Sequence, residues 1–508
     1  MKTLEAVIEI GSTAIRLMVF QVDSTGTWNT IDKAELPVAL GRDVFTNGDI
    51  SRDTLLKCTR ILLRFSELLD GWNIDRFHTA IIATSAVREA SNRDMFIDRI
   101  YVKTNYKVKV IDGIEENRLM YLSTVEVLRK DAPQLMKQNA LIFEIGGGST
   151  ELMLLQHGKM VAAHSLYLGT VIINQYQKRI LGSVSDSRRF ISDYIKTAGI
   201  NMSSEINFSH IKLCITLGTE TLIAAHEVGE KIGERIWSIS KNKFVSFVNS
   251  IQEYSIEECL ARFHLSYNEA NSLQVGLLTY KLFMQLTAAE KMIVTDVSVR
   301  EGLLINRISA PDDIQTMFCS QIIASARSIG RKYNFDEPHA QYVHDAAIKI
   351  YDSIKNELVL PASARILLEV SAYLHDIGVF IRTNNHNLHS QYIIAHSDIF
   401  GLSKDDIHIV SLVARYHRGK IRYQDDESYR SLSRLERMQV LKLAAILRVA
   451  DALDRGHSQH IKDFTIEQQE DKLIFHIKEI HNANLEKLAL TEKSDLFESV
   501  FSYSIVLL

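Results

Sequence analysis

Two matching stretches decide the fold, IEIGSTAIRL at 8–17 and LIFEIGGGSTEL at 141–152. Each predicts a strand, a glycine turn and a second strand, over 6–20 and over 141–156. The turns are, in order, Gly11, Ser12 and Thr13, and Gly146, Gly147, Gly148, Ser149 and Thr150. An acidic residue precedes each turn, and these two, Glu9 and Glu144, lie 135 positions apart. That spacing is the length of one domain and predicts an internal duplication.

Further elements extend the pattern on both sides of these stretches. Short strands are predicted at 79–83, 107–111 and 213–217, the last running into a third turn at Gly218 and Thr219, and 115–127 predicts a helix. After residue 303 apolar residues recur at spacings of three and four, as in Ala346, Ile350 and Ile354, which is typical of helices. Near the end of the chain, within 464–508, residues 472–477 alternate like a strand. The sequence therefore predicts α/β twice, then an α-helical part, then a small α+β cap.

Composition limits the class of protein. A length of 508 residues predicts three or four domains, and 46% apolar with 24% charged residues is a globular mixture. The formal net charge of −4 argues against a surface built for nucleic acid. Four separated cysteines without a CxxC pair fit a reducing compartment. No signal peptide or membrane helix is recognisable, so we expect a soluble, cytoplasmic protein.

The glycine turns predict a phosphate-binding site. Backbone N–H groups in such turns cradle phosphate oxygens, and a carboxylate at the strand end, here Glu9 or Glu144, holds Mg²⁺. For either turn alone, a hairpin that uses glycine for its backbone geometry is an equal alternative. Two such turns spaced by one domain favour a cleft that binds phosphates.

The motifs resemble those of the exopolyphosphatase and guanosine pentaphosphate phosphohydrolase (Ppx/GppA) family, over essentially the whole chain. Besides the two opening stretches, the likeness is carried by ATSAVREASN at 83–92, VIDGIEENRLMYL at 110–122, LGTETLIAAHE at 217–227 and VREGLL at 299–304. The resemblance implies duplicated actin-like (ribonuclease H-like) α/β domains, an all-α HD-like domain and a small α+β C-terminal cap. The expected boundaries are 1–125, 126–304, 305–460 and 461–508.

The resemblance also implies residue roles. Glu116 would be the catalytic glutamate that orients water, and Arg88 would contact the substrate. The phosphate-binding set would be Gly11, Ser12, Thr13, Arg16, Thr84, Ser85, Gly146, Gly147, Gly148, Ser149, Gly218 and Thr219. The family has aspartate where this chain has Glu9 and Glu144, and each glutamate is longer by about 1.5 Å. We therefore expect a re-formed site for Mg²⁺, with Mn²⁺ as the alternative ion, or a loss of activity.

Histidine is concentrated in the helical part, where 339–460 holds ten of the chain's 18. His344, His375, Asp376 and Asp451 follow the order of a metal-dependent HD-type phosphohydrolase, with His389 and His417 as further candidates. YLHDIG at 373–378, HNLHS at 386–390, RYHRG at 415–419 and LRVADALDR at 447–455 resemble the HD-like domain of long family members. A second divalent metal there and a metal-free structural cluster both stay open. Asp451 could equally pair with Arg448.

A basic stretch lies at 415–448, with nine Lys and Arg against four Asp and Glu. It could guide a polyanion, or it could be a solvated helical face.

The favoured function is that of an exopolyphosphatase, which releases terminal phosphate from inorganic polyphosphate. We expect the protein to be a homodimer and to have no nucleic-acid or membrane partners. A guanosine pentaphosphate 5′-phosphohydrolase is the nearest alternative. A non-catalytic sensor of polyphosphate or alarmone, and nucleotide cleavage at His375 and Asp376, are the others.

Overall fold

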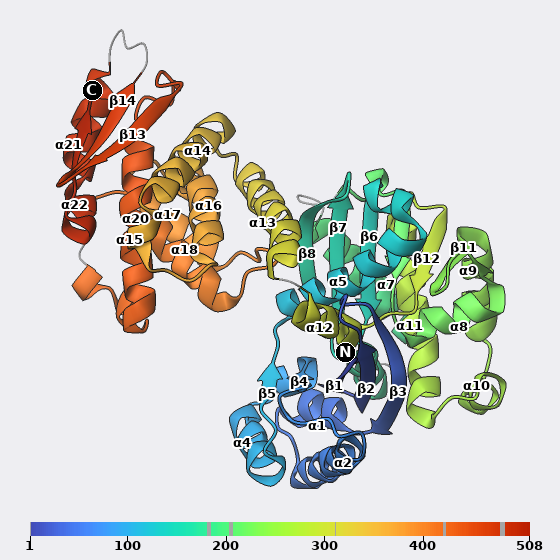
Figure 1. Cartoon of the computed structure of the whole chain (residues 1–508). Helices are drawn as coiled ribbons and strands as arrows, with labels where there is room; N and C mark the ends of the chain where they lie inside the picture. Colours follow the sequence, from blue (N-terminus) through green and yellow to red (C-terminus); the bar gives the residue numbers. More distant parts are fainter. Residues whose placement is uncertain (1, 180–183, 203–206, 310, 420–422, 478–482) are drawn as a thin grey trace. The chain divides into compact units, whose positions relative to one another are not determined.

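The computed structural model describes residues 2–179, 184–202, 207–309, 311–419, 423–477 and 483–508. Its elements form two compact units, residues 1–317 and 318–508. In Figure 1 the first unit runs from blue to yellow and the second from yellow to red. The finer boundaries at 125, 304 and 460 stay predictions.

The first unit contains two sheets with the same strand order. In one, the order is β3-β2-β1-β4-β5, and in the other the strands β8-β7-β6-β9-β12 repeat it, followed by β11 and β10. In each, three antiparallel strands are followed by strands parallel to the first. The bounds are β1 (Thr3–Ile10), β2 (Ala14–Val22), β3 (Trp28–Pro37), β4 (Thr79–Ala83), β5 (Val108–Val110), β6 (Ala140–Ile145), β7 (Thr150–Gln156), β8 (Lys159–Leu166), β9 (Leu213–Thr216), β10 (Glu230–Lys231), β11 (Ile236–Ser240) and β12 (Lys291–Thr295). The predicted duplication is confirmed.

Helices flank these sheets (Figure 1). They bury their apolar faces in two hydrophobic cores, one on each sheet. They are α1 (Leu40–Asn47), α2 (Arg52–Gly71), α3 (Ser85–Glu89), α4 (Arg93–Thr104), α5 (Gly113–Asp131), α6 (Thr170–Arg179), α7 (Val184–Met202), α8 (Thr219–Val228), α9 (Lys241–Ile251), α10 (Ile256–Phe263), α11 (Tyr267–Leu286) and α12 (Val299–Ile308), with short 3₁₀ helices at Pro133–Lys137 and Phe208–His210. Helix α13 (Pro311–Lys332) crosses the boundary between the units.

Helix α5 connects the two sheets of the first unit. It follows β5 of the first sheet and packs against β7 and β8 of the second. It begins before the predicted residue 115 because the Asp112 side chain accepts a hydrogen bond from the Glu115 N–H (2.8 Å) and caps the helix. Helix α12 packs on α5 and β1, and a Cβ at Gly302 would collide with the Leu119 carbonyl, so the two helices meet backbone to backbone. This packing fixes the helix that carries Glu116.

The second unit is helical with one small sheet. Its helices are α14 (Glu337–Ser353), α15 (Lys355–Leu358), α16 (Ala364–Leu374), α17 (His386–Ala395), α18 (Lys404–Tyr416), α19 (Glu427–Arg430), α20 (Arg434–Ala452), α21 (Asn484–Lys493) and α22 (Asp495–Phe501), with 3₁₀ turns at Ile377–Phe380 and Tyr423–Asp425. The sheet has β14 (Lys472–Ile477) between β13 (Phe464–Gln469) and β15 (Ser504–Leu507). The predicted helical part and α+β end of the chain are thus both present.

Two expectations from the sequence concern the cysteines and membrane-spanning helices. All four cysteines are free thiols, and three of them are buried. Within the described residues no helix has the length and apolarity needed to cross a membrane.

Candidate active site

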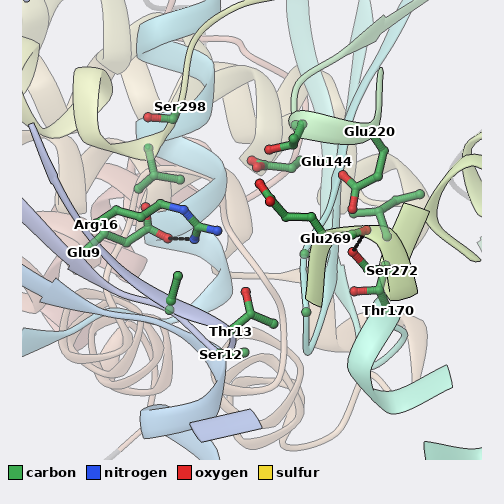
Figure 2. A pocket seen from close by; sticks show the side chains of 18 of the residues that line it. Glu9, Ser12, Thr13, Arg16, Glu144, Thr170, Glu220, Glu269, Ser272 and Ser298 are labelled. Atoms are coloured by element: carbon green, nitrogen blue, oxygen red, sulfur yellow. Dashed lines mark hydrogen bonds and ion pairs between the residues drawn. The ribbon is translucent and has the colours of Figure 1, made fainter. Parts of the chain in front are cut away.

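Both predicted glycine turns line one cleft of about 520 Å³ in the first unit (Figure 2). Each turn is closed by an equivalent backbone hydrogen bond. The Gly11 N–H donates to Ala14 O (3.0 Å), and the Gly146 N–H donates to Ser149 O (2.8 Å). In the part of the chain that the structure describes, the N–H groups that follow within the turns donate no hydrogen bond; these belong to Ser12, Thr13, Gly147 and Gly148. Unsatisfied N–H groups at a cleft are suited to an anion.

The two turns approach each other closely, which explains their small residues. A Cβ at Gly147 would lie 2.9 Å from the Ser12 Cβ, and a Cβ at Gly148 would collide with the Phe45 ring. Gly148 itself does not line the cleft, whereas the third turn does, through Gly218 and Thr219. Gly218 has a φ of 108°, which side chains rarely adopt. Thr84 and Ser85 also face the cleft, and the Ser85 hydroxyl lies 3.1 Å from that of Ser12.

Glu116 lies in the cleft wall and is held by Arg88. The Arg88 Nη1 donates to the Glu116 carboxylate (3.2 Å) and to Ile111 O (2.9 Å). Burial raises the pKa of Glu116, and the Arg88 charge opposes this rise. Arg88 is not itself among the residues lining the cleft, so the structure shows it as the partner that orients Glu116.

Glu144, whose side chain is shown in Figure 2, has neighbours of like charge. Burial, followed by the charges of Glu9 and Glu116, raises the pKa of Glu144 to about 8. Burial also raises the pKa of Glu220 to about 7. Glu151, directly opposite Glu144 in the β6–β7 pair, has its pKa raised by burial and then by the charge of Glu116. Sequence reasoning missed Glu151 and Glu220, although both lie within the quoted motifs.

Glu9 differs because arginines occupy both of its oxygens. Its Oε2 lies 2.7 Å from the Arg300 Nη1, and its Oε1 lies 3.7 Å from the Arg16 Nη1 (Figure 2 shows the second pair). Arg16 is also bound to both oxygens of Glu35 at 3.1 Å. Arg300 was not predicted as a site residue, although it lies in the VREGLL motif.

The acidic residues of the cleft fit a divalent cation. Burial raises the pKa of the carboxyl groups of Glu144 and Glu151, and the charge of Glu116 raises both further; a cation relieves that repulsion. Carboxylate oxygens are the ligands that Mg²⁺ prefers. Glu144 therefore fits the ion. Glu151 fits it while keeping neutral hydrogen-bond donors, because its oxygens accept from Asn117 (3.1 Å) and Ser165 (2.7 Å). Glu9 fits less well because its partner Arg300 is itself a cation.

The raised pKa of Glu144 gives a pH-dependent stability. In the unfolded chain a glutamate ionises near its ordinary value of 4.5, but in the fold Glu144 keeps its proton up to about 8. Between these values unfolding releases a proton, so stability falls as pH rises. We expect the unfolding temperature of metal-free protein to fall between pH 6 and 8.5, and Glu144→Gln to reduce that fall by roughly 2–4 °C. Calorimetry measures this; the exposed Glu253→Gln is the control, and an equal fall in both variants would contradict the assignment.

The predicted HD-like residues lie in the second unit, and the structure brings together only some of them. His375, Asp376 and Asp451 lie close to one another, with the His375 Nε2 3.7 Å from the Asp376 Oδ1 and 4.0 Å from the Asp451 Oδ1. His344 lies apart from them, because its ring pairs with Asp345 (2.8 Å) and Glu369 (3.2 Å).

His339, one helical turn and a residue earlier on α14, takes the place expected for His344. A five-residue difference rotates the side chain to another face of the helix. His386 and His417 both lie close to Asp376. His417 was one of the two further candidates in the sequence and His386 was not, whereas the other candidate, His389, is not part of this group. Asp451 pairs with Lys493 rather than with Arg448, which instead pairs with Asp495 (2.7 Å).

The basic stretch at 415–448 is partly structural. Arg448 is buried and donates to the carbonyls of Lys493, Tyr416 and Gly419, while Arg415 pairs with Asp426 (3.2 Å). Arg418, Arg430 and Arg434 are exposed, and Lys420 and Arg422 lie outside the described residues.

Two α/β halves with one strand order, and a cleft between their glycine turns, define an actin-like protein. The model of the Ppx/GppA phosphatase family matches residues 18–310, and that of Ppx/GppA phosphatase domain III matches residues 323–499. The chain belongs to the Ppx/GppA phosphatase family.

Individual relatives agree with this. The chain is 24% identical to a guanosine-5′-triphosphate,3′-diphosphate pyrophosphatase of Aeromonas hydrophila, over 92% of this chain and 91% of the relative. The protein of the same name from Photobacterium profundum is 24% identical over 93% and 91%. The crystal structure of an exopolyphosphatase from Cytophaga hutchinsonii superposes with a TM-score of 0.54 at 22% identity, covering 60% of this chain and 98% of that one. The last comparison supports the fold.

Proposed function

We propose that the cleft hydrolyses terminal phosphoanhydride bonds of inorganic polyphosphate and releases orthophosphate. The observation that carries the proposal is the pair of turns that line one cleft, with Glu116 in its wall; among the described residues the N–H groups of Ser12, Thr13 and Gly147 there donate no hydrogen bond. The N–H groups of the turns bind phosphate oxygens, and the small residues Ser12 and Gly147 let the two turns approach each other.

Glu116 orients the attacking water and takes its proton. Its carboxylate is fixed by Arg88, and its raised pKa brings it nearer to the operating pH of a general base. Mg²⁺ or Mn²⁺, held by Glu144 and Glu151, would supply positive charge to the phosphoryl oxygens. Arg300 also lines the cleft, where its charge neutralises that of Glu9.

Guanosine pentaphosphate 5′-phosphohydrolysis is the second candidate. It is favoured by the curated relatives, which carry the name guanosine-5′-triphosphate,3′-diphosphate pyrophosphatase and align over nine-tenths of the chain. The same turns and Glu116 serve both reactions, because both cleave a terminal phosphoanhydride. The cytoplasmic location and the homodimer stay predictions.

Phosphate release from long-chain polyphosphate and from guanosine pentaphosphate, measured at equal Mg²⁺ and then equal Mn²⁺, tests the proposal. We expect the polyphosphate rate to exceed the pentaphosphate rate, and the reverse order would favour the second candidate. The double variant Glu9→Asp, Glu144→Asp restores the shorter carboxylates of the resembled motifs. Release by this variant alone, with none from the natural chain, would favour a sensor instead of an enzyme.

A further inference from the structure

Four histidine rings in the second unit are each held by a hydrogen bond at Nδ1. Each Nδ1 faces an oxygen that only accepts: Ala372 O for His375 (2.8 Å), Thr383 O for His386 (2.9 Å), Ala414 O for His417 (2.5 Å) and the Asp454 carboxylate for His339 (2.8 Å). Two acceptors cannot bond without a proton, so each Nδ1 carries the N–H. In the neutral ring each Nε2 is then a lone-pair donor, which is the tautomer of a histidine that binds metal through Nε2.

For three of the histidines, the position at a helix end explains the hydrogen bond at Nδ1. His375 and His417 cap the C-terminal ends of α16 and α18, where the last carbonyls have no helical N–H partner. Each ring donates to the carbonyl three residues before it, as His386 does at the start of α17. The rings are therefore oriented by the helix ends that carry them.

The four Nε2 atoms converge on the carboxylates of Asp376 and Asp451. The Nε2 atoms of His339 and His375 are buried and have no hydrogen-bond partner among the described residues. Those of His386 and His417 lie 3.2 Å apart and face each other. Two lone pairs at that distance repel, so either a proton or a metal ion lies between them.

The distances match two ion positions. Ligand atoms about 2.1 Å from an ion in tetrahedral or octahedral geometry lie about 3.0–3.4 Å from one another. Around His386, His417 and the Asp376 Oδ1 the separations are 3.0, 3.2 and 3.3 Å. Around His339 and His375 they are 3.6 to 4.0 Å to Asp376 and Asp451, so this group must contract by a few tenths of an ångström.

Asp376 belongs to both groups of ligands. Residues outside these groups hold the carboxylates of Asp451 and Asp454 in position. Asp376 is the residue common to the triad with His339 and His375 and to the triad with His386 and His417. Lys493, from α21, binds the Oδ2 of Asp451 and leaves its Oδ1 facing the histidines. Asp454 is held by the N–H groups of Ser458 and Gln459 while it accepts from His339. Such outer bonds orient metal ligands.

We propose that the second unit binds two divalent transition-metal ions that share the Asp376 carboxylate. His339, His375 and Asp451 complete one position, and His386 and His417 complete the other. Four imidazoles with two carboxylates select first-row ions such as Mn²⁺, Fe²⁺, Co²⁺ or Zn²⁺ over Mg²⁺, which prefers oxygen alone. Ions reach the site from the side of Asp376, whose side chain is 19% exposed, and of His457, which stacks on His339 and is 39% exposed.

Cobalt uptake by the full chain tests this proposal. The protein is stripped with a chelator and dialysed against Co²⁺ with a large excess of Mg²⁺, which keeps the carboxylate cleft of the first unit occupied by Mg²⁺. We expect about two retained Co²⁺ per chain by elemental analysis, with imidazole scattering in X-ray absorption. No retained Co²⁺, a single ion, or a spectrum without imidazole would overturn it. Neither readout depends on phosphate release or on a variant that folds.

Variants then assign the ligands. Asp376→Asn is expected to lose both ions, and His386→Gln about one. His344→Gln is the matched control, because His344 lies on the same helix as His339 but has both ring nitrogens paired elsewhere, and it should retain both ions. Equal retention by Asp376→Asn and the natural chain, or metal loss in His344→Gln but not in His339→Gln, sinks the assignment. Far-UV circular dichroism checks that each variant is folded.

Discussion

Replacing Glu116 by glutamine lowers the rate of phosphate release by about 10²- to 10⁴-fold, while substrate binding changes little. Glutamine keeps the size of the side chain and can still accept a hydrogen bond from Arg88, but it cannot take a proton from water. The rate is measured as orthophosphate released from polyphosphate, and binding by equilibrium dialysis of the substrate.

Glu115 provides a matched control for this change. It is the neighbouring residue on α5, but both of its oxygens are bound by Arg118, at 2.6 and 2.9 Å. Glu115→Gln should therefore keep most of the activity. If Glu116→Gln retains more than about a tenth of the rate, or if both variants lose it equally, Glu116 does not orient the water.

Replacing Arg88 by alanine is expected to lower the rate about 10²- to 10³-fold. The change removes the charge that opposes the burial-driven rise in the pKa of Glu116, and it leaves Ile111 O without its donor. The pKa of Glu116 then rises further, so the acid limb of the pH–rate profile moves to higher pH. Arg88→Lys should restore that limb in part, because lysine keeps the charge but lacks the planar fork that reaches both acceptors.

Arg93 is the control for Arg88. It lies nearby at the start of α4, and its side chain is 52% exposed. Its two contacts are both long, a 3.5 Å pair to Asp94 and a 3.5 Å hydrogen bond to the backbone carbonyl of Arg88, and neither involves the Arg88 guanidinium. Arg93→Ala should leave both the rate and the pH profile unchanged. A loss of rate in Arg88→Ala without any shift of the acid limb would assign Arg88 to substrate contact alone, and not to holding Glu116.

The strands and turns of the first unit were predictable because their determinants are local. A strand, a glycine turn and a second strand depend on neighbouring residues, so β1, β2, β6 and β7 agree with the sequence within a few residues. The repeat of that pattern also predicted the duplicated sheet order. The start of α5 was missed because the Asp112 cap had not been recognised as its beginning.

The sets of charged residues were less predictable. Glu151 and Glu220 carry no local mark of function; they matter because sheet pairing and helix packing bring them to a cleft where burial raises their pKa. Arg300 reaches Glu9 across 291 positions of sequence. In the second unit, His339 and His344 are both histidines of helix α14 and lie only five residues apart. The order of the motifs along the chain is compatible with either of them as the ligand.

The sequence by itself determined the duplicated α/β architecture, the phosphate-type turns and the family's motif order, because each depends on short-range backbone preference or on a repeated pattern. Only the tertiary structure decided which carboxylates share the cleft, that Glu9 is neutralised by Arg300, and that His339 rather than His344 joins His375 and Asp376. The physical reason is the same in each case. The ionisation and pairing of a side chain depend on burial and on charges a few ångströms away, and these neighbours come from distant parts of the chain.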